Sequence, residues 1–389
     1  MKSILFLLED YNYFYTNEST KLLKANNSVT FESMINNLIQ KKHYQADSLA
    51  LAFSKIGYDT DIIIPEANPL QLKWVKENNT LLYYKWLIEK PIRSFKSRFL
   101  KQYRYSYNSI QFKVLLAQVK KSNPDIIYFY SNIFITEKQI IELKKYSKKI
   151  VLQWSCPVWN NELKFPYHKF DLIITAAIQL KEYFGEKKIN TAYIQQAFDD
   201  SIVSQFKQKT DSYKGDVIFI GSFTLGHHHR FEVLEYLLQQ GVNLTIHGTG
   251  KENLPTNSLV YKNIKEPLHG IDMYNEYRNY KMAIHIKGTG DVNDTIDWNK
   301  YAGAKRLFEI TGSGTLLLTS NQDNVKDLFE IDKEVIVFND AEDLLIKINN
   351  IVNDDDKIKK MALAGMERTL KNHSFLSRAK ELEPFLFDK

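Results

Sequence analysis

Residues Val217–Ser222, with the sequence VIFIGS, decide how the second half of the chain folds. Four consecutive apolar residues predict a strand that is buried on both faces, as in a parallel sheet. Gly221 and Ser222 end this strand, and a helix is predicted over Phe231–Gln240. A strand that ends in glycine and serine before a helix is a common place for a phosphate group in α/β proteins.

The same alternation of buried strand and helix extends over the rest of the chain. The first half has apolar runs at Ile4–Leu8, Thr60–Ile64, Asp125–Tyr130, Ile150–Trp154, Leu172–Thr175 and Thr191–Ile194. The second half adds Leu244–His247, Ala283–Ile286 and Thr315–Thr319. Because helical patterns lie between these runs, the sequence predicts an α/β protein with two successive units, each a doubly wound parallel sheet. The polar stretch Asp199–Asp216 is predicted to link them.

The composition is that of an ordinary globular protein. The chain has 389 residues, of which 44% are hydrophobic and 25% charged, and this length suggests two or three domains. Cys156 is the only cysteine, which excludes a disulfide framework and a metal site made of cysteines alone. The apolar run Ile4–Leu8 is too short for a secretion signal or a spanning helix, so a cytoplasmic protein is expected.

Arg306 and Glu309 form the first candidate binding site. They stand three residues apart and so share one face of a helix, which is predicted to start near Ala302–Ala304. A cation beside the free N–H groups of a helix start suits a diphosphate, and a carboxylate suits the paired hydroxyls of a ribose. The alternative is an exposed ion pair with a structural role only.

The loop that follows Ser222 is the second candidate. Its three adjacent histidines cannot share one helix face, so a metal site is not expected there. One imidazole, His229, and the Arg230 side chain are instead expected to face an anion. Neither of the two Asp-x-Asp strings, Asp59–Asp61 and Asp354–Asp356, ends a strand, and no metal ligand is predicted.

The segment Lys90–Arg104 contains six basic residues and no acidic one, which equals the net charge of +6 of the whole chain. Phe95, Phe99 and Tyr103 recur at spacings of four and would share one side of a helix. Such a segment suits an anionic membrane surface, a phosphorylated acceptor or RNA, and a solvated helix is the structural alternative. We expect peripheral contact with anionic lipid on the inner face of the membrane, and no nucleic acid partner.

An ordered set of motifs in the second half resembles the C-terminal domain of the CgeB-like (spore maturation type) group-1 glycosyltransferases. The motifs are Ile220-Gly221-Ser222 with Arg230, Leu268-His269-Gly270 with Met273, Tyr274 and Tyr277, Arg306-x-Phe308-Glu309 with Gly312-x-Gly314, Glu334–Phe338 with Leu344, and His373-Ser374 with Arg378. The similarity covers Asp216–Leu382, and the first half matches only at the level of the fold pattern.

The resemblance implies the GT-B fold, in which two Rossmann-like domains with parallel sheets face each other. Residues 1–205 would form the acceptor-side domain, residues 206–374 the nucleotide-sugar-binding domain, and residues 375–389 a helix that returns to the first domain. The donor substrate would be a nucleotide-diphosphate sugar, with no cofactor and no metal. The acceptor would be a glycan or a lipid-linked molecule in surface polysaccharide or glycoconjugate synthesis.

The resemblance also assigns roles to single residues. Glu309 would bind the ribose of the donor. The residues implied at the diphosphate are Arg230, Arg306, Gly221, Ser222, Gly314 and Thr315. The two arginines would stabilise the leaving diphosphate in place of a metal. Candidates for the base on the acceptor side are Asp10, at the end of the first strand, and His43.

Tyr301 departs from the family pattern. Retaining relatives often have two glutamates with seven residues between them, and Glu309 matches only the second. Asp291, Asp294 or Asp297 could supply the missing carboxylate, and retaining stereochemistry is favoured over inverting. Two alternatives stay open: a nucleotide-sugar epimerase of the same fold, and a non-catalytic protein that binds sugar or RNA.

Overall fold

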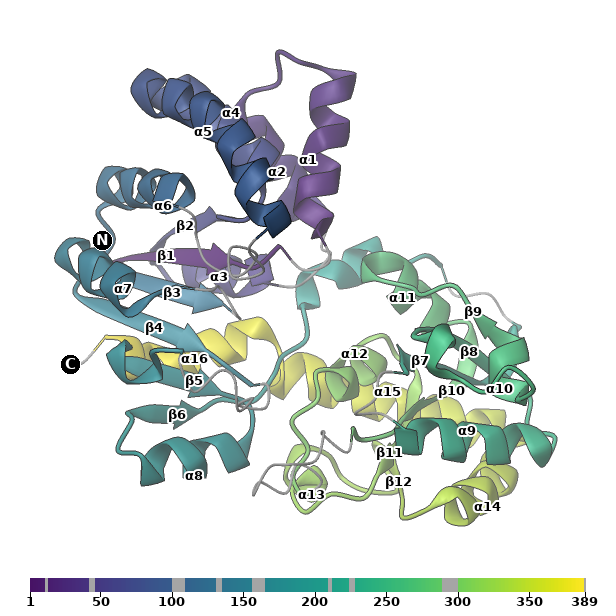
Figure 1. Cartoon of the computed structure of the whole chain (residues 1–389). Coiled ribbons are helices and arrows are strands. Elements are labelled where there is room, and N and C mark those ends of the chain that lie inside the picture. The colour runs from purple at the N-terminus through teal and green to yellow at the C-terminus, as the bar shows by residue number, and fades with distance from the viewer. Residues whose placement is uncertain are drawn as a thin grey trace. The chain divides into compact units, whose positions relative to one another are not determined.

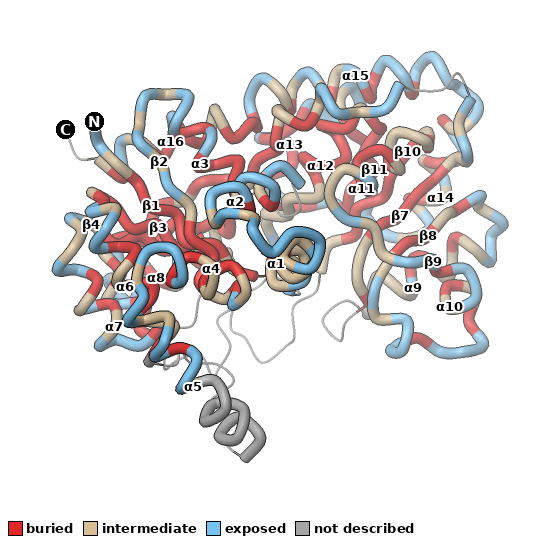
Figure 2. The backbone as a smooth tube through the Cα atoms, turned by 90° about the horizontal axis from the view of Figure 1, so that it is seen from above, coloured by how far each residue is buried: buried red, intermediate tan, exposed pale blue. Residues whose placement is uncertain are grey.

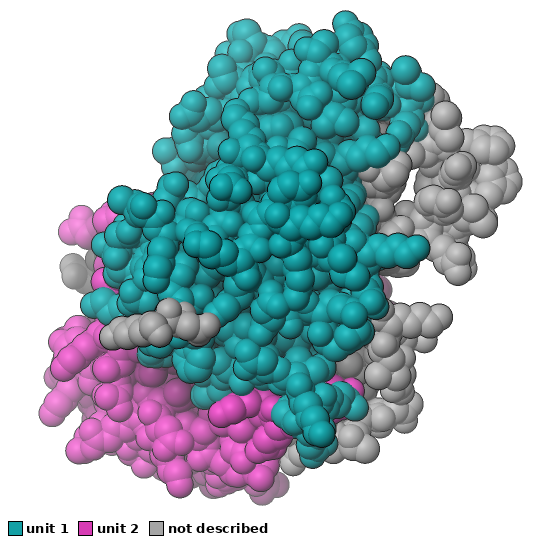
Figure 3. Space-filling model, turned by 90° about the vertical axis from the view of Figure 1, so that its left-hand side faces the viewer, with its two compact units in different colours: residues 1–175, 184–194, 379–389 teal, residues 176–183, 195–378 magenta. Residues whose placement is uncertain are grey.

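The computed structural model describes residues 1–10, 13–41, 46–99, 109–130, 135–155, 165–208, 212–223, 228–288 and 300–387, without the side chains of residues 46, 90–99, 109 and 228. The predicted base His43 lies outside the described residues. The chain divides into two compact units (Figure 3). Unit 1 comprises residues 1–175, 184–194 and 379–389, and unit 2 comprises residues 176–183 and 195–378.

Unit 1 is built on a six-stranded parallel sheet in the order β2-β1-β3-β4-β5-β6 (Figure 1). Its strands are β1 (Ser3–Leu8), β2 (Asp59–Ile63), β3 (Ile126–Tyr130), β4 (Lys149–Gln153), β5 (Leu172–Thr175) and β6 (Thr191–Tyr193). Its helices are α1 (Phe14–Ala25), α2 (Phe31–Gln40), α3 (Ala46–Lys55), α4 (Asn68–Asn78), α5 (Thr80–Phe99), α6 (Ser109–Ser122) and α7 (Glu137–Leu143). The helix α8 (Ile178–Glu186) has residues in both units.

Unit 2 has a second six-stranded parallel sheet, in the order β12-β11-β10-β7-β8-β9 (Figure 1). Its strands are β7 (Gly215–Ser222), β8 (Leu244–Thr249), β9 (Ile264–Lys265), β10 (Tyr280–His285), β11 (Leu316–Ser320) and β12 (Ile336–Phe338). Its helices are α9 (His228–Gln239), α10 (Leu259–Asn263), α11 (Gly270–Tyr277), α12 (Arg306–Gly312), α13 (Val325–Leu328), α14 (Ala341–Ile351) and α15 (Asp355–Asn372). The two sheets confirm the predicted fold of two Rossmann-like α/β units.

Both faces of the second sheet are buried, as β7 shows most clearly (Figure 2). Val217 and Phe219 pack in a cluster with residues of α9 and α14. Ile218 and Ile220 pack in a second cluster, with residues of α11 and α12. Because alternate residues of a strand point to opposite faces, a run of four apolar residues requires a helical layer on each side.

The last helix, α16 (Phe375–Leu386), ends in unit 1, as predicted for a helix that returns to the first domain. The hydroxyl of Tyr58, just before β2, donates to Oε1 of Glu383 (2.6 Å). The Tyr58 ring stacks on Phe387 with a centroid distance of 4.6 Å. Lys149, at the start of β4, donates to the carbonyl of Phe385 (3.1 Å). These contacts fix the end of the chain on unit 1.

The predicted lipid-binding segment Lys90–Arg104 lies largely outside the described residues. The backbone of α5 continues to Phe99, but the side chains from residue 90 onward and residues 100–108 are not described. Contact of this segment with a membrane therefore stays a prediction. Within the described residues, none of the helices combines the length and the apolar content that crossing a bilayer requires.

Gly248 should be necessary for the pairing of β7 with β8. The two strands pair Gly248 with Gly221, and a Cβ atom on Gly248 would lie 2.1 Å from the carbonyl oxygen of Gly221. We expect Gly248→Ala to destabilise the protein by about 1–3 kcal/mol, as overpacking does. The matched control is Gly185→Ala in α8, where an added Cβ meets no atom within 4 Å. Urea denaturation followed by circular dichroism measures both, and an unchanged midpoint for Gly248→Ala contradicts the prediction.

Candidate functional site

Unit 2 has a topological switch point between β7 and β10. From β7 the chain continues to β8 on one side, and it later returns to β10 on the other side of β7. Ligands of parallel α/β sheets bind at such a point, outside the carboxyl ends of the strands. In unit 2 these ends are Ser222 and His285, so a ligand is expected at this edge of the sheet.

The Arg230 side chain joins the two strand ends. It comes from the first turn of α9, and its Nε donates to the carbonyl of Ile286 (3.1 Å), while its Nη1 donates to the carbonyl of Ser222 (3.1 Å). Burial and the nearby charge of Arg306 lower the pKa of the Arg230 guanidinium to about 10. Among the residues that the structure describes, no carboxylate pairs with Arg230, so its charge is available to a bound anion.

Arg306 and Glu309 form an ion pair at the start of α12, in which Glu309 is buried and Arg306 is partly buried. Nη1 of Arg306 lies 2.8 Å from Oε2 of Glu309, whose side chain is only 5% exposed, and Nζ of Lys305 lies 3.5 Å from Oε1. Burial by itself would raise the pKa of the Glu309 carboxyl, but Arg306 and Lys305 hold it below its ordinary value. The alternative, an exposed ion pair, is therefore wrong for Glu309, whose side chain is buried because α12 packs into the core of unit 2.

The helix begins later than predicted. α12 starts at Arg306, not near Ala302–Ala304. The N–H of Ala302 donates to Oδ1 of Asn324 (2.6 Å), and its carbonyl accepts from Nδ2 of the same residue (2.9 Å). Nε2 of Gln195 donates to the Ala302 carbonyl as well (3.1 Å). These side chains hold the backbone before the helix, and they use the Ala302 N–H that was expected to face an anion.

Two histidines near the arginines, His285 and His269, were not among the candidate site residues from the sequence. His285, at the carboxyl end of β10, is buried, and its Nδ1 lies 2.9 Å from Oγ1 of Thr319. Burial and the charges of Arg230 and Arg306 lower the pKa of His285 to about 3, so it is neutral. Burial and Arg306 likewise lower the pKa of His269, which precedes α11. The position of His285 at the end of a buried strand was the sequence signal for it.

The charges at this edge favour an anion. Arg230, Lys305 and Arg306 contribute three positive charges, Glu309 contributes one negative charge, and the two imidazoles are neutral. The site therefore has an excess of two positive charges among the described residues. The positive charges suit a diphosphate, and the Glu309 carboxylate suits a group with hydroxyls that is attached to it.

Gly221 and Ser222 lie at the same edge, but their contacts are with the protein. A Cβ atom on Gly221 would lie 2.6 Å from the Phe219 ring, so glycine is needed there for packing. The Ser222 carbonyl accepts the bond from Arg230. Any contact of these two residues with phosphate stays a prediction.

Three other predicted residues do not join this group. The His229 side chain is 43% exposed, and its Nδ1 lies 3.4 Å from Oε2 of Glu232. Gly314 and Thr315 lie between α12 and β11, at the amino end of the strand. Because α12 runs from the carboxyl edge of the sheet back to its amino edge, these residues are at the opposite edge from Arg230.

Asp10 and Glu66 lie at the corresponding edge of the sheet in unit 1. The Asp10 carboxylate accepts from the N–H groups of Tyr15 (2.7 Å) and Thr16 (3.1 Å) and thus binds the first turn of α1. The N–H of Asp10 donates to Oε2 of Glu66 (3.1 Å). Burial, and then the charges of Glu9 and Asp10, raise the pKa of Glu66 to about 7. Glu66 was not a sequence candidate, because its pKa depends on burial that a lone glutamate after β2 does not reveal.

The acidic strings have structural contacts in the described residues. Asp354 accepts from the N–H of Lys357 (3.0 Å) and caps α15. Asp59 and Asp61 are exposed residues of β2. The described residues contain no group of three or more His, Cys, Asp or Glu side chains placed to hold a metal ion.

Comparison with known proteins finds a similarity in the part of the chain that carries Arg230 and Arg306. Residues 230–384 match the family model described as glycosyl transferase-like. No curated protein matches the chain. This part of the chain is thus similar to glycosyltransferase-like domains, whereas the narrower resemblance to the CgeB-like group stays a prediction.

Solved structures with a similar fold cover the whole chain. A glycosyltransferase from Rickettsia africae aligns over 100% of this chain and 99% of its own, with a TM-score of 0.59 and 13% identity. Sucrose-phosphate synthase from Thermosynechococcus elongatus aligns over 99% and 98%, with a TM-score of 0.55 and 9% identity. HepE from Anabaena, solved in complex with UDP-glucose, aligns over 99% of both chains, with a TM-score of 0.56 and 12% identity. The chain therefore has the GT-B fold.

The raised pKa of Glu66 predicts a pH-dependent effect on stability. In the folded protein the pKa is about 7, against an ordinary value of 4.5. The neutral carboxyl thus favours the folded state below pH 4.5, and this contribution is lost as the pH rises through about 7. Glu66→Gln keeps an acceptor for the Asp10 N–H and never ionises. Its melting temperature should rise relative to the original protein between pH 5 and pH 8, and a difference that is constant with pH contradicts the assignment.

Proposed function

We propose that this protein is a glycosyltransferase that moves a sugar from a nucleotide-diphosphate donor to a glycan or lipid-linked acceptor. The observation that carries the proposal is the pair of partly buried guanidiniums, Arg230 and Arg306, at the switch point of the second sheet. The match of residues 230–384 to glycosyltransferase-like proteins supports it. HepE, which shares the fold, has been solved with UDP-glucose, and this supports a nucleotide-sugar donor.

In the proposed reaction, the bond between the anomeric carbon and the β-phosphate oxygen breaks, and a bond to the acceptor oxygen forms. The departing diphosphate gains negative charge, which Arg230 and Arg306 stabilise at a buried edge where Coulomb interactions are strong. Glu309 accepts from the ribose hydroxyls and so orients the donor. His285 stays neutral beside both arginines and adds no charge of its own.

The acceptor hydroxyl must lose its proton to a base. Asp10 and His43 are the candidates for this role, although the Asp10 carboxylate also binds the first turn of α1. We place the reaction in surface polysaccharide or glycoconjugate synthesis, with retention of configuration at the anomeric carbon. A lipid-linked acceptor would explain the basic segment Lys90–Arg104, because anionic lipid attracts dense positive charge.

Substitutions at Arg230 and Glu309 should separate binding of the diphosphate from binding of the ribose. Arg230→Met removes a charged donor, so affinity for UDP, GDP, CDP or TDP and for inorganic pyrophosphate should fall by about 10- to 150-fold. Glu309→Gln should weaken only the nucleotides, because pyrophosphate has no ribose. Isothermal titration calorimetry measures both effects.

Arg368→Met is the matched control for these measurements. The Arg368 side chain, like that of Arg230, donates from Nε to a backbone carbonyl, that of Leu328 (3.2 Å), but it lies on α15 and pairs with Glu334. Its nucleotide affinity should equal that of the original protein. Equal loss in Arg368→Met and Arg230→Met would mean that the effect is a general destabilisation, and full affinity in Arg230→Met would refute the assignment.

The reaction should proceed without a divalent metal, because the two guanidiniums supply the positive charge that a metal would otherwise bring to the diphosphate. Release of nucleoside diphosphate should require an acceptor and persist in excess EDTA. Loss of activity in EDTA that magnesium or manganese restores would contradict the metal-free reaction. Conversion of the donor with no acceptor present would instead indicate an epimerase.

A further inference from the structure

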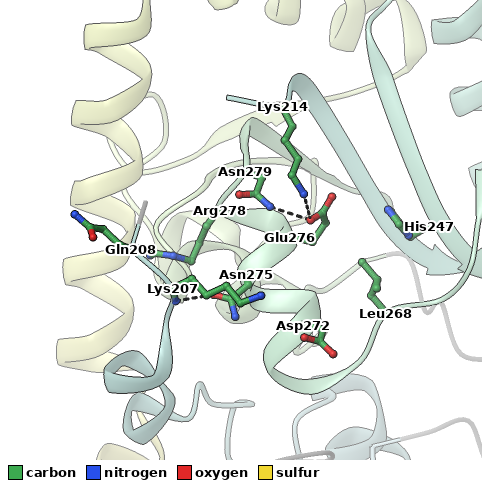
Figure 4. Close-up of a pocket in the computed structure, with 10 residues that line it drawn as sticks. All are labelled: Lys207, Gln208, Lys214, His247, Leu268, Asp272, Asn275, Glu276, Arg278 and Asn279. Carbon is green, nitrogen blue, oxygen red and sulfur yellow. Dashed lines mark hydrogen bonds and ion pairs between the residues drawn. The ribbon is translucent and has the colours of Figure 1, made fainter. Parts of the chain in front are cut away.

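A pocket of about 290 Å³ lies in unit 2, on the face of α11 that points away from the candidate donor site (Figure 4). This helix separates the pocket from the candidate donor site. Tyr274 faces the donor site, where its hydroxyl donates to Oε1 of Glu309 (3.4 Å). Asp272 and Asn275, on the other face of the helix, line the pocket, and His247 of β8 forms part of the opposite wall.

Two buried polar atoms of the pocket lining have no hydrogen-bond partner: Nε2 of His247 and Nε of Arg278. His247 is only 9% exposed. Its Nδ1–H donates to the carbonyl of Glu266 (2.8 Å), because a carbonyl can only accept, and this leaves Nε2 without a partner. Nη1 of Arg278 donates to the carbonyl of Ser313 (3.0 Å), which leaves its Nε as a donor without an acceptor. Because buried polar groups are nearly always paired, both atoms are available to a polar ligand or to water.

Among the residues that the structure describes, the charged side chains of the lining leave an excess of one positive charge. Nζ of Lys214 pairs with Oε2 of Glu276 (2.9 Å), so these two charges cancel. Lys207 and Arg278 then face only one further carboxylate of the lining, that of Asp272. The Lys207 backbone N–H donates to Oδ1 of Asn275 (2.9 Å), and this bond holds Lys207 at the pocket. A ligand with one negative charge would complete the balance.

We propose that this pocket binds a carbohydrate that carries one anionic group, a carboxylate or a phosphate. Arg278 and Lys207 bind the anion, which both side chains can reach as donors. Asn275, Asp272 and His247 bind sugar hydroxyls, because a hydroxyl donates as well as accepts and can therefore pair with an amide, a carboxylate and an imidazole nitrogen. The proposal does not depend on the donor site.

The test measures binding of glucuronate and glucose 6-phosphate, with glucose as the neutral comparison, by calorimetry and ligand-observed NMR. At least one of the two anionic sugars should bind more tightly than glucose. Lys207→Glu and Arg278→Gln should each weaken that binding by about tenfold or more. Lys207 is exposed, so its substitution tests the site even if Arg278→Gln fails to fold. Lys251→Glu, an exposed lysine of the same unit outside the pocket, is the matched control and should bind as the original protein does.

Arg230→Met distinguishes the two sites. Retained binding of the anionic sugar by this variant supports a separate pocket, whether or not the variant still binds nucleotide. Loss of binding in Arg230→Met would place the sugar at the donor site and overturn the proposal. Absence of binding by both anionic sugars, or equal binding of glucose, would overturn it as well.

Discussion

The hydrogen bonds of Arg230 to the carbonyls of Ser222, which ends β7, and Ile286, which follows β10, are the interaction on which the candidate site of unit 2 depends. The guanidinium of Arg230 joins the ends of β7 and β10, the two strands between which the strand order reverses. Burial and Arg306 make its charge costly, as its lowered pKa indicates. Among the residues that the structure describes, Arg230 has no carboxylate partner, and an anionic ligand at the switch point would relieve the cost of its charge.

The surrounding core explains why this arrangement is stable. The apolar run of β7 packs between two helical layers, and one of them includes α11 and α12. α12 brings Arg306 and Glu309 to the same edge as Arg230, while α11 brings Tyr274 against Glu309. These charged groups are therefore held by elements whose other residues form the core, so packing determines the geometry of the part of the site that the structure describes.

The sequence was sufficient for the fold because buried parallel strands leave a strong apolar signal. Both sheets, the returning helix α16 and the position of Arg230 after the first strand of unit 2 could all be predicted. The start of α12 could not, because side-chain bonds from Asn324 and Gln195 hold the preceding backbone. Gly314 and Thr315 were predicted near the diphosphate because they follow Glu309 closely in sequence. In the structure, α12 carries the chain to the opposite edge of the sheet before β11 begins, and the sequence spacing does not reveal this. The shifted pKa values of Glu66 and His285 could not be predicted either, because they depend on burial and on charges that are distant in sequence.

We propose that Arg230 and Arg306 together bind a diphosphate, and a crystal structure of the protein with the nucleoside diphosphate that binds most tightly tests this. The phosphate oxygens should lie within hydrogen-bond distance of both guanidiniums, and the ribose hydroxyls should contact Glu309. A nucleotide bound with its phosphates at Gly314 and Thr315, at the opposite edge of the sheet, would refute the proposal.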